Sequence, residues 1–420
     1  MSTFSFLHAA DLHLDTPFEG LSVDQPELAR QLREASLVAF DRLVDAAIDR
    51  GAAFVVLAGD VYDGIERGLR AQFRLRHGLE RLSEAGIPTF VAHGNHDPVG
   101  EGAGPEGAAS GVHVFGPGEV RSIPVERGGA RIATVHGISF STREEKTNLA
   151  RLFRRGPEPG VHVGVLHCNV DGQPGHDPYA PCSRADLEAA GLDYWALGHV
   201  HTRATLLDGR TWAQYPGNLQ GRSFKPSEQG PKGAVLVHVE DDSVRGVEFL
   251  PLAPIVFSSV EVDVAGHTDL PSVQGALVDA ALREAEVPGC EGLLLRARLT
   301  GRGPLHHELG RRWDELREAL NEETASRTPW IRWERLTRDT RPEVNRDRIA
   351  ERDDLAGEIL RRIDALVRDP EAMKNLALEV DGKLRGPSLA KVVDPLGLEE
   401  LEALLREVEL DALERLEVEG

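Results

Sequence analysis

Residues 87–100 read IPTFVAHGNHDPVG, an apolar run that gives way at once to an amide, an imidazole and a carboxylate. The run Ile87–Val91 predicts a buried strand, and Pro98 prevents regular structure from continuing. A glycine at position 94 permits a sharp turn or a positive φ just before Asn95. The stretch therefore predicts a tight loop at the end of a strand, where α/β proteins tend to place their chemistry.

The composition is typical of a globular protein with more than one domain. The 420 residues are 41% hydrophobic and 28% charged, and no run of about 18 apolar residues predicts a membrane span. The amino terminus lacks the features of a secretory signal, and the three cysteines include no C-x-x-C pair, so we expect a cytoplasmic protein. A net charge of −21 disfavours simple nucleic-acid binding, although it leaves room for a local basic surface.

Apolar runs alternate with amphipathic stretches over the first 250 residues, which predicts an α/β fold with strands covered by helices. The predicted strands are Phe4–Ala9, Phe54–Ala58, Ile87–Val91, Ile132–His136, His162–Leu166, Tyr194–Leu197 and Ala234–Val239, and the predicted helices are Leu28–Asp49 and Arg70–Ala85. The pattern of strand-forming and helix-forming stretches changes near Leu250, and after Pro342 nearly all residues favour helices. We therefore expect three parts: residues 1–250, a small α+β unit over residues 251–345, and a helical region over residues 346–420.

Five polar clusters follow apolar runs, each at the end of a predicted strand. They are Asp11-Leu12-His13, Gly59-Asp60-Val61-Tyr62-Asp63, Gly94-Asn95-His96-Asp97, His167, and Gly198-His199-Val200-His201. Carboxylate, imidazole and amide groups together suit a divalent metal such as manganese, iron or zinc. Residues two apart on a strand point the same way, so Asp11 and His13 can converge on one ion, and His199 and His201 can face one cleft. One carboxylate can bridge two ions about 4 Å apart.

These clusters resemble the motifs of the calcineurin-like metallophosphoesterases. The stretches HAADLHLDTPFEGL, AGDVYDG, YAPCSRADL, DYWALGHVH and YPGNLQGR further resemble the DNA-repair exonuclease branch, which includes YhaO-type proteins and SbcD-type nuclease subunits. The resemblance covers residues 1–250 closely and the remainder in outline. It implies a β-sandwich flanked by helices, a small α+β second domain and a helical C-terminal region.

The resemblance also implies roles for individual residues. One metal ion would be held by Asp11, His13, Asp60 and His201. A second ion would be held by Asp60, Asn95, His167 and His199. His96 would face the scissile phosphate, and Asp97 would orient His96. Further substrate contacts are expected from Asp63, Tyr215, Asn218 and Arg222, although for Asp63 a supporting hydrogen-bonding role is the more frequent one.

The implied activity is a two-metal DNA nuclease, a 3′→5′ exonuclease and single-strand endonuclease that acts in double-strand break repair or end processing. Manganese is the expected metal, with iron, zinc or magnesium as alternatives. The implied partners are DNA, a second copy of the chain, and an SMC-like ATPase docked through the C-terminal helices, with residues 395–418 as the candidate contact. The chain contains no P-loop, so any ATP dependence would come from that partner.

Two other functions stay open at this point. A phosphodiesterase or phosphatase acting on small or cyclic nucleotides would use the same metals, and the acidic net charge favours it because a small substrate needs no long basic track. A mainly architectural subunit that tethers DNA is the other alternative. The complete set of motif residues argues against this third possibility.

Overall fold

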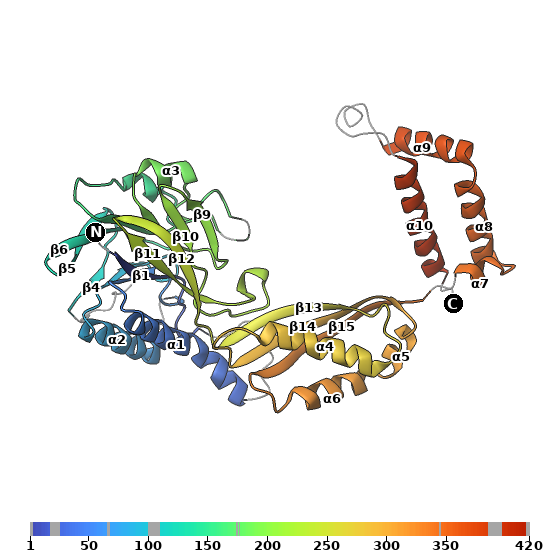
Figure 1. Ribbon diagram of the computed structural model, residues 1–420, viewed down its shortest axis with the longest axis horizontal. Coiled ribbons are helices and arrows are strands. Elements are labelled where there is room, and N and C mark those ends of the chain that lie inside the picture. The colour runs from blue at the N-terminus through green and yellow to red at the C-terminus, as the bar shows by residue number, and fades with distance from the viewer. Residues whose placement is uncertain are drawn as a thin grey trace. The chain divides into compact units, whose positions relative to one another are not determined.

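A computed structural model describes residues 3–16, 26–64, 68–99, 110–173, 175, 177–343, 346–384 and 397–416 (Figure 1). The chain divides into two compact units. The first comprises residues 1–260, 277–297 and 319–336, and the second comprises residues 261–276, 298–318 and 337–420. The predicted three-part division of the chain stays a prediction.

The first unit contains two six-stranded sheets. The first sheet has the order β12-β11-β1-β2-β3-β4. Its strands are β1 (Thr3–Ala9), β2 (Val55–Ala58), β3 (Thr89–Ala92), β4 (Val112–Val114), β11 (Gly233–Glu240) and β12 (Ser243–Pro251). The strands β1 to β4 pair in parallel, whereas β11 and β12 are antiparallel additions at one edge.

The second sheet has the order β5-β6-β7-β8-β10-β9. Its strands are β5 (Arg121–Arg127), β6 (Ala130–Gly137), β7 (Val161–His167), β8 (Tyr194–Gly198), β9 (Ala204–Asp208) and β10 (Trp212–Tyr215). The pairs β6–β7, β7–β8 and β8–β10 are parallel. All seven predicted strands exist, but β4, β5, β9, β10 and β12 were not predicted because they are short or partly exposed.

The two sheets pack face to face, and helices cover their outer faces. Side chains alternate along β1, so Phe4 and Phe6 enter the core between the sheets, whereas Leu7 and Ala9 face helices α1 (Pro26–Asp49) and α2 (Leu69–Glu84). Helix α3 (Arg184–Ala189) packs on the outer face of the second sheet. The predicted β-sandwich flanked by helices is therefore confirmed.

The remaining chain forms a third sheet and a set of helices. Strands β13 (Ile255–Asp263), β14 (Gly292–Gly303) and β15 (Trp330–Pro342) form the sheet, in that order. The helices are α4 (Leu270–Ala285), α5 (His306–Arg311), α6 (Trp313–Thr324), α7 (Arg346–Ala350), α8 (Leu355–Val367), α9 (Pro370–Leu384) and α10 (Leu398–Arg415). Among the described residues, no helix has the length and apolar character that a membrane span requires.

Candidate metal centre and active site

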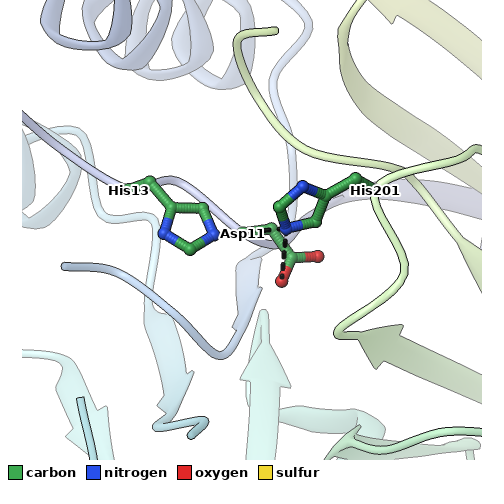
Figure 2. A group of neighbouring side chains, drawn as sticks. All are labelled: Asp11, His13 and His201. Atoms are coloured by element: carbon green, nitrogen blue, oxygen red, sulfur yellow. Dashed lines mark hydrogen bonds and ion pairs between the residues drawn. The ribbon is translucent and has the colours of Figure 1, made fainter. Parts of the chain in front are cut away.

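The predicted ligands gather at the carboxyl ends of strands from both sheets of the sandwich. Asp11 follows β1, Asp60 follows β2 and Asn95 follows β3, while His167 ends β7 and His199 follows β8. Because the central strands of each sheet run parallel, their carboxyl ends meet at one edge, and the packing of the sheets joins the two edges. The fold therefore brings residues up to 190 positions apart into one site, as in the pair Asp11 and His201 (Figure 2).

One group of potential ligands consists of Asp11, His13 and His201, whose ligand atoms lie within 4.8 Å of one another. Figure 2 shows the side chains of Asp11 and His13, from the segment after β1, lying beside that of His201, from the segment after β8. The Nε2 atoms of His13 and His201 are 3.3 Å apart, and Nε2 of His201 lies 4.0 Å from Oδ1 of Asp11.

A second group consists of Asp11, Asp60 and His167. The His167 Nε2 atom lies 3.3 Å from Oδ2 of Asp60 and 3.0 Å from Oδ1 of Asn95. The ring of His199 lies beside that of His167, with centroids 5.2 Å apart. The structure thus brings together all seven predicted ligands, while their division between two ions stays a prediction.

The chemistry of this donor set fits divalent cations. Asp11, Asp60 and His167 are buried, so their charges are poorly solvated. Nδ1 of His13 is buried and has no hydrogen-bond partner among the described residues. Two imidazole nitrogens that face each other across 3.3 Å can share at most one proton between them, whereas both can donate lone pairs to a cation.

The pKa values of Asp11 and His167 show that the buried carboxylates of the site favour a positive charge beside them. Burial raises the pKa of Asp11 to about 6, although His167 and His201 oppose this shift. Burial lowers the pKa of His167, but Asp60 and Asp11 outweigh burial and raise that pKa to about 9. A cation would take over the role of the His167 proton, and its binding would release protons.

Four of the predicted ligands have strained backbones. The φ angles of Asp11, His13, Asp60 and His199 are 51°, 43°, 48° and 99°. Residues other than glycine seldom adopt positive φ, and each such residue costs on the order of 1–3 kcal/mol. Positive φ also occurs at five other described non-glycine residues that are not proposed ligands, but at these four positions it directs potential ligands into one site.

Gly94 lies so close to two proposed ligands that a side chain at this position would collide with them. At Gly94 a Cβ atom would lie 2.3 Å from Oδ1 of Asp60 and 2.8 Å from two ring atoms of His167. The glycine is therefore required by close approach, and not by the positive φ that the sequence also allowed, because Gly94 is absent from the positive-φ residues of the described chain.

The ring of His96 contacts the carboxylate of Asp63, and not that of Asp97, which was predicted to orient it. The His96 Nδ1 atom lies 2.5 Å from Oδ1 of Asp63, and Oδ2 of Asp63 accepts a hydrogen bond of 2.9 Å from the Arg222 guanidinium. Burial lowers the pKa of His96, but Asp63 and Asp60 outweigh burial and raise it above its ordinary value. This arrangement favours the protonated form of the imidazole, with its Nδ1 hydrogen held by Asp63.

The predicted role of Asp97 is corrected by its contacts. Its carboxylate accepts hydrogen bonds of 2.9 Å from the backbone N–H groups of Val61 and Gly94, and it lies 3.0 Å from Nδ1 of His93. Asp97 therefore holds the loops after β2 and β3 together, and Asp63 contacts His96 in its place. The physical reason is that buried backbone N–H groups and His93 occupy the Asp97 carboxylate, whereas the His96 ring lies against Asp63.

Two predicted substrate contacts, Tyr215 and Asn218, are also corrected. Both side chains are fully buried. The Tyr215 hydroxyl donates to the Cys168 carbonyl at 2.8 Å, and Nδ2 of Asn218 donates to the Glu228 carboxylate at 2.8 Å. These residues support the site from within the protein, whereas Arg222 and Asp63 are partly exposed and stay predicted substrate contacts.

Among the groups that contact the predicted histidine ligands, sequence reasoning missed Glu228 and the backbone carbonyl of Asp177. Glu228, in the 3₁₀ turn η3 (Pro226–Glu228), lies 2.5 Å from Nδ1 of His201. The backbone carbonyl of Asp177 lies 2.8 Å from Nε2 of His199. Neither has a local signal in the sequence, because Glu228 stands in an ordinary polar stretch and a carbonyl is present at every residue.

Comparisons with known proteins agree with this geometry. Residues 4–203 match the calcineurin-like phosphoesterases, and residues 257–341 match the middle domain of the metallophosphoesterase YhaO. The chain is 33% identical to the metallophosphoesterase YhaO of Bacillus subtilis (strain 168) over 428 residues, which cover 100% of this chain and 99% of that protein. The chain belongs to the YhaO-type calcineurin-like metallophosphoesterases.

More distant relatives of this YhaO-type protein are DNA double-strand break repair proteins named Mre11. The one from Aeropyrum pernix is 28% identical over 229 residues, or 51% of this chain and 53% of that protein. The one from Sulfurisphaera tokodaii is 26% identical over 249 residues, or 58% of this chain and 61% of that protein. The YhaO-type chain thus matches little more than half the length of these Mre11 proteins.

Proposed function

We propose that this metallophosphoesterase is a two-metal DNA nuclease, with 3′→5′ exonuclease and single-strand endonuclease activity on DNA ends. The observation that carries the proposal is the convergence of seven potential ligands beside a carboxylate-supported histidine, His96. Similarity to Mre11 proteins, which are named for DNA double-strand break repair, supports DNA as the substrate.

The ligands would be divided as the family resemblance implies. Asp11, His13, Asp60 and His201 would hold one ion, and Asp60, Asn95, His167 and His199 would hold the other. When bound, a pair of divalent cations, which we propose to be manganese, supplies charge neutralisation at the phosphoryl oxygens and an activated water nucleophile.

His96 acts on the substrate as a proton donor. Asp63 holds the Nδ1 hydrogen, so Nε2 is the ring nitrogen that presents a proton to the leaving oxygen of the phosphodiester. The pKa of His96, which Asp63 and Asp60 raise against the effect of burial, favours this protonated form. Arg222 holds the far side of Asp63, which fixes the orientation of the pair.

Partners of the proposed nuclease are DNA, a second copy of the chain and an SMC-like ATPase. Helix α2 exposes Leu69 and Phe73 at 72% and 56%, which suits a homodimer interface. Helix α10 exposes Leu404 and Val408 and lies within the predicted docking segment 395–418, whose residues 395, 396, 417 and 418 are outside the described part. We place the protein in the cytoplasm.

The decisive assay is manganese-dependent degradation of linear duplex and single-stranded DNA, labelled at the 3′ or the 5′ end. Bis-p-nitrophenyl phosphate serves as a small diester in parallel. His96→Ala removes the proton donor, and His238→Ala is the matched control because its ring contacts Ser5 and Glu248 away from the ligands. DNA cleavage that is lost only in His96→Ala supports the proposal.

A second function has one observation in its favour. The net charge of −21 suits a phosphodiesterase of small or cyclic nucleotides. Turnover of the small diester with no DNA cleavage, both alone and with an added SMC-like ATPase, would reject the nuclease in favour of this enzyme. DNA binding without any turnover would favour the architectural subunit.

A further inference from the structure

A buried carboxylate outside the predicted ligand set lies directly behind the candidate metal centre. Glu228 is 5% exposed, and its Oε1 atom lies 2.5 Å from Nδ1 of His201. Its Oε2 atom accepts hydrogen bonds of 2.8 Å from Nδ2 of Asn218 and 2.9 Å from the backbone N–H of Arg222. Both oxygens therefore receive donors, and the carboxylate is fully engaged.

These contacts determine where the His201 ring carries its hydrogen. A carboxylate only accepts hydrogen bonds, so the His201 Nδ1 atom must be the donor in the 2.5 Å contact. The other nitrogen, Nε2, then has a lone pair, and this is the atom that lies 3.3 Å from Nε2 of His13 and 4.0 Å from Asp11. With the opposite tautomer a hydrogen would point into the group of ligands.

We propose that Glu228 is a positioning residue for the metal centre, which holds His201 in the Nδ1–H tautomer with its Nε2 lone pair directed at the cation shared with Asp11 and His13. The inference rests on the proposed metal-dependent function and names a residue that controls it. A carboxylate behind a metal-binding histidine raises the basicity of the ring and fixes its orientation.

The surroundings of Glu228 hold it in this place. The backbone N–H of Glu228 donates to the Lys225 carbonyl at 2.8 Å, which closes the turn η3. The buried Lys232 ammonium donates to the His201 carbonyl at 2.8 Å and to the Ser227 carbonyl. The turn that carries Glu228 is therefore tied to the segment that carries His201 at two separate points.

The same carboxylate also reaches the proton donor. Through the backbone of Arg222, Glu228 positions a residue whose guanidinium holds Asp63, and Asp63 holds the His96 ring. One carboxylate thus supports a proposed ligand on one side and the proposed acid on the other. Loss of Glu228 is expected to weaken cation binding strongly and to disturb the contact between His96 and Asp63 to a smaller extent.

The variant Glu228→Gln tests the proposal because the amide has nearly the same shape. Two donors face Oε2, so the amide oxygen is favoured on that side and the amide NH₂ group faces Nδ1 of His201. Nδ1 must then accept, which moves the ring hydrogen to Nε2. The expected results are a switch of the His201 tautomer and a 10–100-fold loss of Mn²⁺ affinity at one of two sites, as is usual for such supporting residues.

The experiment uses the full chain without any substrate. Imidazole nitrogens are observed by ¹⁵N NMR in the metal-free, histidine-labelled protein, and Mn²⁺ affinity and stoichiometry are measured by calorimetry. Glu248→Gln is the matched control, because Glu248 contacts His238 at 3.4 Å in an exposed pair remote from the ligands. Glu228→Ala is a second variant, which removes both acceptors without introducing a new donor.

The possible results either support or overturn the proposed role of Glu228. A tautomer switch with weakened Mn²⁺ binding in Glu228→Gln, and neither change in Glu248→Gln, supports the proposal. A wild-type His201 with its hydrogen on Nε2, or folded Glu228 variants that bind two Mn²⁺ ions with wild-type affinity, overturns the proposal while the metal centre stands. A wild-type protein that binds no Mn²⁺ overturns the proposed function itself.

Discussion

Replacement of Gly94 by alanine is the most direct test of how tightly this site is built. The added Cβ atom would lie 2.3 Å from Oδ1 of Asp60 and 2.8 Å from two ring atoms of His167. Contacts below about 3 Å are far inside van der Waals distance, so one of these groups must move. The backbone of Gly94 has no positive φ, so alanine introduces no torsional strain and the effect is purely steric.

The magnitude follows from the two groups that must move. Forcing an extra methyl group into a packed interior costs about 1–3 kcal/mol of unfolding free energy. The atoms that would move are also proposed ligands, so we expect Mn²⁺ affinity to fall at least tenfold, with the larger loss at the site that contains His167. Denaturant unfolding of the metal-free protein and Mn²⁺ calorimetry measure the two effects separately.

Gly246→Ala is the matched control. Gly246 lies in β12, its added Cβ would meet no atom within 4 Å, and its φ is not positive. We expect this variant to change the unfolding free energy by less than about 0.5 kcal/mol and to leave Mn²⁺ binding unchanged. Wild-type stability together with wild-type Mn²⁺ affinity in Gly94→Ala would refute the close approach on which the argument depends.

Three further predictions address other parts of the molecule. Asp63→Asn removes the charge that supports His96, and we expect kcat for bis-p-nitrophenyl phosphate to fall about 10–100-fold with little change in Mn²⁺ affinity, by steady-state kinetics and calorimetry. Burial lowers the pKa of His136 to about 4 from its ordinary value of 6.5, so the unfolded chain binds more protons between these values and stability is lost as pH falls through this window. Between pH 7 and 5 this loss is about 2 kcal/mol, and urea unfolding should show a smaller loss in His136→Gln. Arg346→Ala leaves the 2%-exposed Glu409 without one of its two arginine partners. We expect the free energy of unfolding of the C-terminal helices, measured by hydrogen exchange, to fall by about 1–3 kcal/mol. Calorimetry should show unchanged Mn²⁺ binding, and a different result in either measurement would contradict the prediction.

Local patterns were sufficient where the chemistry depends on neighbouring residues. Strand-end clusters such as Asp11 with His13 and His199 with His201 are visible because polar residues directly follow apolar runs in the sequence. The extended alternation expected within these clusters is wrong, because Asp11, His13 and His199 lie beyond the strands with positive φ angles. Continuous apolar runs predicted the central strands, because both faces of these strands are buried. Short edge strands such as β4 were not predicted, because they have no such apolar run.

Partners across the site depend on distances that no local pattern contains. The family resemblance placed Asp97 behind His96, but the Asp97 carboxylate accepts hydrogen bonds from backbone N–H groups, and Asp63 from the loop after β2 contacts His96 instead. Tyr215 and Asn218 fell within a recognisable motif and yet lie in the interior. A motif shows which residues accompany a site, but not which of them face it.

The sequence by itself was sufficient to recognise the family and the layered α/β architecture and to propose the ligands of a metal centre, because strand periodicity and residue chemistry are properties of short stretches of sequence. Only the tertiary structure decided that Asp63 supports His96, that Glu228 supports His201 and that Gly94 must lack a side chain. These contacts join residues on separate loops, and their distances arise only when the two sheets pack face to face.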